Sequence, residues 1–284
     1  MNSCPLVSVI TPMFNGEAFI TETIQSVQSQ DYENWEMLVI DNCSTDRGRQ
    51  IVESFVAADA RVKLLSNTHN SGSPGQPRNI GMRNARGKYL AFLDADDLWF
   101  MDKLSKQVEY LETRTAVCML YGRFQVMGLG RLPECAVLPK LGRMHEGSIF
   151  RDLFLSNNYI PCLTVMVRNR FADNYCFDEN PRSMEDYDMW LQISRNERVG
   201  YLSQSLGIYR VHGANTTANL RVFVLKYFDL LSVWRKELPA GLMCIKYCLF
   251  VIQLVVIIAR HVKNRLCASV IGYASKYTGC ARFH

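Results

Sequence analysis

Apolar runs alternate with helical periods along the first hundred residues of the chain. Continuous apolar or β-branched runs predict strands over residues 6–12, 35–41, 61–66 and 89–93. Apolar positions at helical spacing predict helices between them, over residues 17–28, 46–56 and 78–85, with Asp46 at the N-cap of the second. This alternation predicts an α/β fold with a mostly parallel central sheet flanked by helices.

The pattern is less regular beyond residue 100. A helix over residues 101–112, a strand over 116–124 and a strand over 163–168 are predicted, followed by a helix in SMEDYDMWLQIS and two short strands that end in YRVHGANTTA. Residues 125–147 have no clear period and are expected to form a loop that faces a substrate. We expect one domain over residues 1–220, with halves at about 1–100 and 101–220, and a helical segment over 221–284.

Acidic residues follow two of the predicted strands. Asp41 ends the strand WEMLVID, and Asp94, Asp96 and Asp97 follow YLAFL within four positions. Ligands bind outside the carboxyl ends of such strands, so Thr11, Asp41 and Asp94 are expected to share one crevice.

Each acidic stretch has two interpretations. The triplet Asp94-Ala95-Asp96 suits a divalent cation with phosphate oxygens, whereas Asp97 or Asp102 could instead start the next helix. Carboxylates this close repel one another unless a cation lies among them. Asp41 could accept hydrogen bonds from a base or a ribose, or could close an Asx-turn.

Four motifs in order resemble the inverting family 2 glycosyltransferases of the GT-A fold. They are TPMFN (residues 11–15), VIDNCSTD, the Arg-Asn-x-Gly of residues 78–81, and FLDADDLW. The resemblance is close over about residues 7–102 and looser to about 215. The chain departs from the usual Asp-Asp-Gly-Ser at Asn42 and Cys43, so nucleotide recognition is carried over to Asp41 only. The fold implied is that of the nucleotide-diphospho-sugar transferases.

The resemblance implies roles for the residues that match the motifs. Asp96 would bind Mn²⁺ or Mg²⁺, and Asp94 would bind the ribose or support the metal. Thr11 and Asp41 would contact the base and ribose, and Arg78 would pair with phosphate or base, for which a guanidinium fork is suited. His212, in YRVHG, lies where many relatives carry a histidine for metal or diphosphate; a histidine on a loop is otherwise a common surface residue.

An inverting transfer also needs a base for the acceptor hydroxyl. The pair Glu185-Asp186 resembles the Glu-Asp motif of the family, which implies Asp186 as the base and Glu185 as an acceptor-binding residue. The alternative is that these acids only stabilise a helix N-terminus. Trp190, like Trp99, could stack on a sugar of the acceptor or pack in the core.

Charge is distributed unevenly along the chain. The formal net charge is +5, but residues 241–284 contain no Asp or Glu and six Lys or Arg, which leaves about −1 for residues 1–240. A basic face for nucleic acid is therefore not expected on the main domain. The N-terminus has no features of a secretory signal and the ten cysteines are scattered, so we expect reduced thiols in a cytosolic setting.

The most hydrophobic stretch lies in the basic C-terminal segment. Residues 247–259 are broken only by Gln253, a run shorter than the ~20 residues of a simple span. We expect a monotopic or re-entrant helix on anionic lipid, although packing on the domain or one full span are alternatives.

The resemblance, together with the basic apolar C-terminal segment, implies a metal-dependent hexosyltransferase at the cytoplasmic face of a bacterial inner membrane. The donor would be UDP-glucose or UDP-galactose. The acceptor would be a lipid-linked sugar such as GlcNAc-diphospho-undecaprenol, in the assembly of O-antigen, lipopolysaccharide or capsule. A nucleotidyltransferase would instead need a glycine-rich basic loop where this chain has MFNGEAF. A catalytically inactive sugar-nucleotide-binding or scaffolding protein is the remaining alternative.

Overall fold

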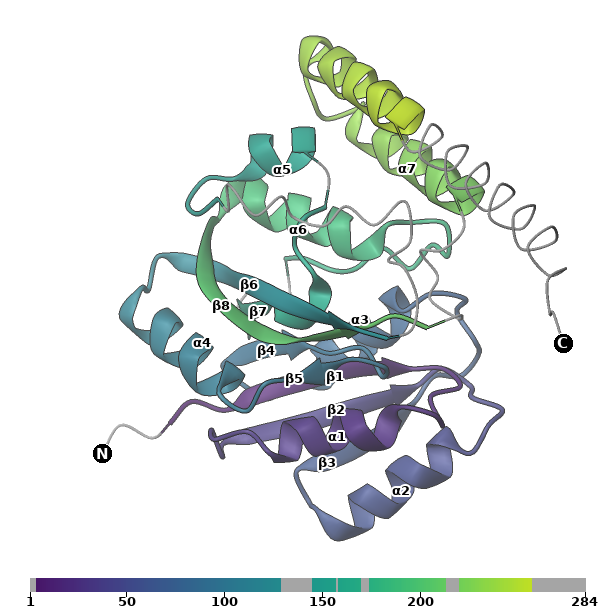
Figure 1. The fold of residues 1–284 in the computed structure, drawn as a ribbon, viewed down its shortest axis with the longest axis vertical. Helices are drawn as coiled ribbons and strands as arrows, with labels where there is room; N and C mark the ends of the chain where they lie inside the picture. The colour runs from purple at the N-terminus through teal and green to yellow at the C-terminus, as the bar shows by residue number, and fades with distance from the viewer. Residues whose placement is uncertain (1–3, 129–144, 157, 170–173, 213–219, 257–284) are drawn as a thin grey trace, which may run out of the picture.

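The computed structural model describes residues 4–128, 145–156, 158–169, 174–212 and 220–256 (Figure 1). Within these ranges one sheet has the strand order β3-β2-β1-β4-β7-β6-β8-β5. Its strands are β1 (Val7–Met13), β2 (Trp35–Asp41), β3 (Val62–Ser66), β4 (Tyr89–Phe92), β5 (Leu98–Trp99), β6 (Val117–Met127), β7 (Met166–Arg168) and β8 (Arg198–Arg210).

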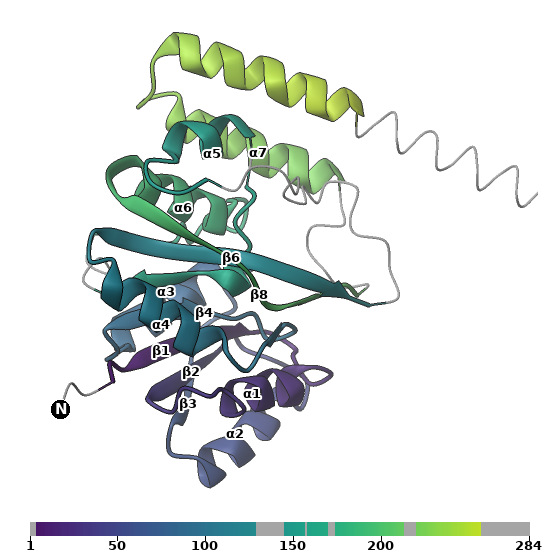
Figure 2. The same ribbon diagram turned by 60° about the vertical axis from the view of Figure 1, so that its left-hand side comes forward.

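Helices cover both faces of this sheet (Figures 1 and 2). They are α1 (Ile20–Gln28), α2 (Gly48–Ala58), α3 (Gly75–Asn84), α4 (Lys103–Thr113), α5 (Phe150–Ser156), α6 (Glu185–Asn196) and α7 (Leu220–Trp234), with a short 3₁₀ turn at Cys162–Thr164. A further helix occupies residues 240–256.

The sheet joins a parallel half to a mixed half. Strands β3, β2, β1 and β4 are parallel, β7 is antiparallel to both β4 and β6, and β6 and β8 are parallel. The carboxyl ends of β1, β2, β4, β6 and β8 therefore lie at the same edge. This edge is where an α/β sheet binds ligands.

Both faces of the parallel half are buried, which explains its continuous apolar runs. Val9, Val39 and Ala91 point to a core shared with α1, α2 and α4, whereas their neighbours Ile10 and Ile40 point to a core shared with α3, α5, α6 and α7. Strands alternate sides at every residue, so each run supplies both cores.

A glycine lets α3 lie directly against the sheet. A Cβ at Gly81 would lie 2.6 Å from Cγ2 of Ile10 and 2.9 Å from Cδ1 of Ile40, so a larger residue would push the helix away. The last position of the Arg-Asn-x-Gly motif thus fixes the depth at which α3 packs, and with it the place of Arg78 one turn earlier.

Three sequence expectations need correction. The two short strands predicted before residue 212 are one long strand, β8. The strand predicted over residues 163–168 begins only at Met166, after the 3₁₀ turn. The predicted loop 125–147 begins as the end of β6, and its residues 129–144 lie outside the described part of the chain.

The described part of the C-terminal segment packs on the domain. The ring of Phe250 stacks on Tyr227 of α7 with centroids 4.1 Å apart, and Nζ of Lys246 lies 3.4 Å from the carbonyl oxygen of Leu155. Lys246 is 1% exposed, and burial lowers its pKa to about 7. Among the residues described, no helix combines the length and apolar character needed to cross a bilayer.

Candidate functional site

Side chains from both halves of the sheet meet at its carboxyl edge. Asp41 ends β2, Asp94 and Asp96 follow β4, and His212 follows β8. The helices α3 and α6 contribute Arg78 and the pair Glu185-Asp186, respectively. A candidate active site is defined by contacts and electrostatic interactions among Arg78, Asp94, Asp96, Glu185, Asp186 and His212. Asp41 lies at the same edge, but its described contacts are with other residues.

The cation among the carboxylates is Arg78. Its Nη2 lies 2.6 Å from Oδ1 of Asp94, and its Nη1 lies 2.9 Å from Oε1 of Glu185. The guanidinium is only 3% exposed, and it lies over the ring of Phe177 at 5.2 Å. A buried two-carboxylate contact of this kind joins α3, the β4 end and α6 into one rigid unit.

Asp96 is paired with His212 from the other half of the sheet. Their Oδ2 and Nε2 atoms are 2.7 Å apart, and the imidazole packs against the ring of Phe19 with centroids 4.7 Å apart. Burial and the nearby Asp94 carboxylate raise the pKa of Asp96, while the contact with His212 lowers it. One oxygen ligand and one nitrogen ligand at a partly exposed edge fit a divalent cation that takes its remaining ligands from a diphosphate.

The described residues hold no group of three or more His, Cys, Asp or Glu that could bind a metal by itself. The protein donors available at this edge are therefore few.

Asp97 has a structural role. It is 1% exposed, and its Oδ1 accepts a hydrogen bond of 2.9 Å from the backbone N–H of Arg210. Burial and the carboxylates of Asp96 and Asp94 raise its pKa well above the usual range. Asp102 occupies the N-cap position of α4, but its side chain makes no capping hydrogen bond. Neither acid faces the candidate site as a ligand.

Asp186 lies at the N-terminus of α6, next to Arg78. Its Oδ1 accepts from the backbone N–H of Tyr187 at 2.7 Å, and its Oδ2 accepts from Nδ2 of Asn158 at 3.1 Å. Burial and the adjacent Glu185 carboxylate raise the pKa of Asp186 to about 7, against the opposing charge of Arg78. A carboxylate with this pKa can accept a proton near neutral pH.

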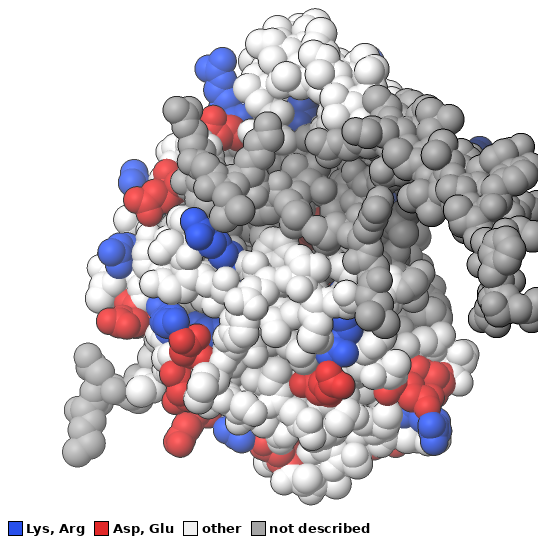
Figure 3. Space-filling view, in the orientation of Figure 1, with Lys and Arg blue, Asp and Glu red and all other residues white. Residues whose placement is uncertain are grey.

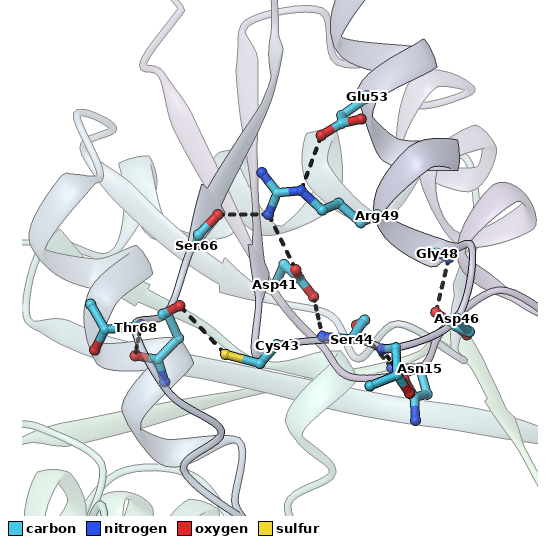
Figure 4. Close-up of polar contacts among 12 residues, drawn as sticks. Asn15, Asp41, Cys43, Ser44, Asp46, Gly48, Arg49, Glu53, Ser66 and Thr68 are labelled. Atoms are coloured by element: carbon cyan, nitrogen blue, oxygen red, sulfur yellow. Dashed lines mark hydrogen bonds and ion pairs between the residues drawn. The ribbon is translucent and has the colours of Figure 1, made fainter.

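Asp41 makes the local turn that the sequence suggested, and it also has a cationic partner (Figure 4). Its Oδ1 accepts from the backbone N–H of Ser44 at 3.0 Å, and its Oδ2 lies 3.2 Å from Nη1 of Arg49. The same Nη1 donates to Oγ of Ser66 at 2.8 Å. The carboxylate is thus held in one orientation at the end of β2.

The two departures from the family pattern have local structural roles. Oδ1 of Asn42 accepts from Nδ2 of Asn67 at 2.9 Å and from the backbone N–H of Ser71 at 3.1 Å, so Asn42 anchors the loop before α3. Cys43 has a φ of 64°, a left-handed conformation that favours glycine. Cys43 thus holds a backbone conformation that suits the glycine of the usual motif.

Replacing Cys43 with glycine should increase stability. The left-handed conformation of a non-glycine residue is strained, so Cys43→Gly is expected to raise the free energy of unfolding by about 0.5–1 kcal/mol, even though glycine favours the unfolded chain. Cys43→Val, with a branched Cβ at the same φ, should lower it by about 1 kcal/mol or more. Urea denaturation of the three proteins measures both effects, and a less stable glycine variant would contradict the account.

Two predicted site residues are fully buried. Thr11 lies within β1, and its Oγ1 has no hydrogen-bond partner among the described residues. Trp190 lies in the core, with its rings 5.9 Å from those of both Phe92 and Phe177. Its side chain does not reach the site, so the acceptor-stacking role suggested for Trp190 is wrong in this structure. Trp190 is a core residue because α6 turns that face toward the sheet.

Three residues at the site were missed from the sequence. Asn158 contacts Asp186, Arg49 contacts Asp41, and Nε of Arg210 donates to the backbone oxygen of Asp96 at 2.9 Å. Arg210 carried a signal, since it stands two residues before His212 in the same motif. Asn158 lies in a stretch without a recognisable motif.

Solved structures share this architecture. The mannosyltransferase PcManGT from Pyrobaculum calidifontis, in complex with GDP-Man and Mn²⁺, matches with a TM-score of 0.66 at 15% identity, over 99% of this chain and 82% of that one. A fragment of S. aureus TarS in complex with UDP-GlcNAc matches with a TM-score of 0.65 at 23% identity, over 80% of this chain and 64% of the fragment. The fold is therefore that of the GT-A glycosyltransferases, as the sequence predicted.

Residues 8–174 match the family model described as glycosyl transferase family 2. The chain belongs to this family. It is 34% identical over 216 residues to the putative teichuronic acid biosynthesis glycosyltransferase TuaG of Bacillus subtilis, covering 76% of this chain and 82% of the relative. It is 31% identical over 229 residues to the Escherichia coli UDP-Glc:alpha-D-GlcNAc-diphosphoundecaprenol beta-1,3-glucosyltransferase WfgD, covering 80% and 85%.

Proposed function

We propose that this chain transfers a hexose, with inversion, from a UDP-sugar to a lipid-linked sugar acceptor during the assembly of a bacterial surface polysaccharide. The observation that supports this most directly is the joined array of Asp94, Arg78, Glu185 and Asp186 at the carboxyl edge of the sheet. The donors favoured are UDP-glucose and UDP-galactose, and the acceptor favoured is GlcNAc-diphospho-undecaprenol. The similarity to WfgD supports UDP-glucose among these donors, and it supports this acceptor.

In this proposal the acceptor hydroxyl oxygen attacks the anomeric carbon of the donor. The bond from that carbon to the β-phosphate oxygen breaks, UDP leaves, and the hydroxyl proton moves to the carboxylate of Asp186. Glu185, held by Arg78, binds the acceptor beside this base. Asp41 orients the base or ribose of the donor, and Asp94 binds the ribose or supports the metal. The side chain of Thr11 is fully buried in the adjoining strand, so no direct contact between it and the donor is proposed.

Asp96 and His212 would hold a divalent cation, Mn²⁺ or Mg²⁺. When bound, such an ion stabilises the negative charge that develops on the leaving diphosphate. The direct contact of 2.7 Å places one carboxylate oxygen next to one imidazole nitrogen, and a bound cation would replace the proton they share. This proximity supports the assignment.

A single assay tests the proposal. UDP release is measured with a panel of UDP-sugars, with Mn²⁺ or EDTA, and with or without a synthetic GlcNAc-diphospho-lipid. Release that needs the metal and increases with this lipid is the expected result. Release without stimulation would exclude this acceptor, and no release with any UDP-sugar would exclude the proposed donor class. In cells we expect the enzyme at the cytoplasmic face of the inner membrane, where such acceptors are made.

A further inference from the structure

Helix 240–256 has two faces of opposite character. Its inner face is part of the core: Met243, Lys246 and Phe250 are 3%, 1% and 1% exposed. Phe250 packs on both Tyr227 and Phe228 of α7. Figures 1 and 2 both show this helix lying beside α7 at one end of the molecule. The helix is therefore a fixed part of the domain, and its outer face has a defined direction.

The outer face is apolar and has no charge. We call it the outer stripe: Ile245, Leu249, Val251, Ile252, Val255 and Val256, which are between 41% and 60% exposed. The only charged residue between positions 240 and 256 is Lys246, which is buried on the opposite face. In Figure 3 the upper end of the molecule, where α7 and this helix lie, is mostly white, with basic and acidic side chains side by side at its border. An exposed apolar surface of this kind marks an interaction site.

The charges around the outer stripe indicate which partner it fits. Arg235 and Lys236 are exposed just before the helix, and the exposed Glu237 that follows them is paired with Arg195 of α6. Residues 257–284, which follow it, contain five Lys or Arg and no Asp or Glu. In a symmetric dimer these basic flanks would oppose one another across the axis. An anionic lipid surface complements both features, because its interior accepts the apolar side chains and its headgroups attract the flanks.

We propose that the outer stripe of helix 240–256 docks flat on an anionic bilayer, with the helix axis parallel to the membrane and its inner face remaining on the domain. This deepens the proposed function, on which it rests only for the choice of a lipid-linked acceptor. The docked helix packs on α7, and Trp234 of α7 packs on Phe154 of α5 and donates to Asp188 of α6, the helix that carries Asp186. These contacts connect the docked face to the candidate site, so a docked enzyme presents its site at a defined height above the lipid surface.

Vesicle binding by the full chain tests the proposal. The parent protein should sediment with vesicles of phosphatidylglycerol and phosphatidylethanolamine, and much less with vesicles of phosphatidylcholine. The double variant Leu249→Glu, Ile252→Glu should bind the anionic vesicles at least about tenfold more weakly. Val56→Glu is the matched control, since Val56 is an exposed apolar residue of α2, and it should bind as the parent does. Unchanged binding by the double variant would overturn the proposal.

A second variant adds a readout that does not depend on introducing charge. With Ile252→Trp, lipids brominated on the acyl chain should quench added tryptophan fluorescence beyond the quenching of the parent protein. Absence of added quenching would show that the stripe does not enter the bilayer. A parent protein that is a dimer without lipid, and that becomes monomeric in the double variant without binding vesicles in either form, would assign the stripe to a second copy instead.

The same variants separate docking from catalysis. The double variant should release UDP at the parent rate with a short-chain soluble acceptor and more slowly with the acceptor embedded in vesicles. If the parent releases no UDP with any donor but still binds vesicles through the stripe, the proposed function fails and the docking surface stands. If UDP release is normal and vesicle binding is absent, the docking proposal alone fails.

Discussion

Replacing Asp186 with asparagine is expected to lower the rate of glycosyl transfer about 10²–10⁴-fold. Asparagine keeps the shape of the side chain and can still accept from the backbone N–H of Tyr187, but it cannot take a proton from the acceptor hydroxyl. The rate at saturating donor and acceptor measures the loss directly. A variant that keeps the parent rate would remove Asp186 from the reaction and favour an inactive scaffold.

The expected loss of rate comes from the missing proton acceptor and not from unfolding. A measurement of stability checks this distinction. Burial and Glu185 raise the pKa of Asp186 in the folded state from 3.8 to about 7. The stability that this group contributes is therefore full below about pH 4 and is lost as the pH rises through about 7. At pH 8 the asparagine variant should be at least as stable as the parent. A chemical denaturation series at pH 5 and pH 8 tests this sign.

A neighbouring residue supplies the matched control. Asp188 carries the same charge in the same first turn of α6, but its Oδ1 accepts from Nε1 of Trp234 at 2.8 Å and its Oδ2 accepts from Nε2 of Gln192. If the acids of this turn act only on the helix dipole, Asp188→Asn and Asp186→Asn should have equal effects on activity. We expect only Asp186→Asn to reduce activity.

The pH dependence of the reaction follows from the same pKa. Asp186 must be deprotonated to act as a base, so the rate should fall about tenfold per pH unit below about pH 7 and level off above it. An acid limb near pH 4, the usual range of a solvated carboxyl group, would contradict the assignment.

The parallel half of the fold was predictable because both of its faces are covered. Strands β1, β2 and β4 then appear as continuous apolar runs, and each ends where a polar side chain reaches the edge. The strand β8 was not predictable as one element, since its burial varies along its length and several of its residues are exposed. The buried and exposed positions along β8 give the sequence pattern of two shorter strands.

The predicted site residues were easier to find than their partners. A motif marks a position, but it does not identify what that side chain contacts in the folded chain. Arg78 is predicted to pair with phosphate or base, and the sequence does not show that it also joins Asp94 and Glu185, which lie 16 and 107 residues further along the chain. The crowded carboxylates predicted that a cation lies among them. In the structure this cation is the guanidinium of Arg78, and the pair of Asp96 and His212 is a separate candidate place for a metal.

Burial decided the cases in which two interpretations were open. Trp190 stands near the acids of α6 in sequence, but helical geometry turns it toward Phe92 and away from the site. Lys246 interrupts an apolar run, so the sequence alone left open whether this segment lies in a membrane or packs on the domain. Its burial against α5 and α7 shows that the run has an inner and an outer face. Composition alone does not show which way the side chains of Trp190 and Lys246 point.

Substitution of Arg78 is expected to affect stability and catalysis together. Its guanidinium is the buried partner of Asp94 and Glu185, and its Nε is itself buried without a hydrogen-bond partner among the described residues. Arg78→Met would leave these carboxylates close together without a cation, and should lower the free energy of unfolding by about 3–5 kcal/mol. Arg83→Met, an exposed arginine of the same helix, should be close to neutral.

Arg78→Lys separates charge from geometry. A lysine keeps the positive charge but has a single ammonium group, which does not reproduce the fork that holds two carboxylates on different elements. We expect the protein to fold and the transfer rate to fall about a hundredfold, because Glu185 and Asp186 lose their fixed position relative to β4. Arg83→Lys should retain the parent rate.

The pH profile distinguishes this positioning role from a general loss of structure. The charge of Arg78 lowers the pKa of Asp186, in opposition to burial and Glu185. With Arg78→Met, the acid limb of the rate should therefore move to higher pH in whatever fraction of the protein remains folded. A variant that loses activity with an unshifted acid limb would show that Arg78 supports the fold without controlling the base. A shifted acid limb would instead show that the charge of Arg78 controls the pKa of Asp186, the group that takes the proton of the acceptor hydroxyl.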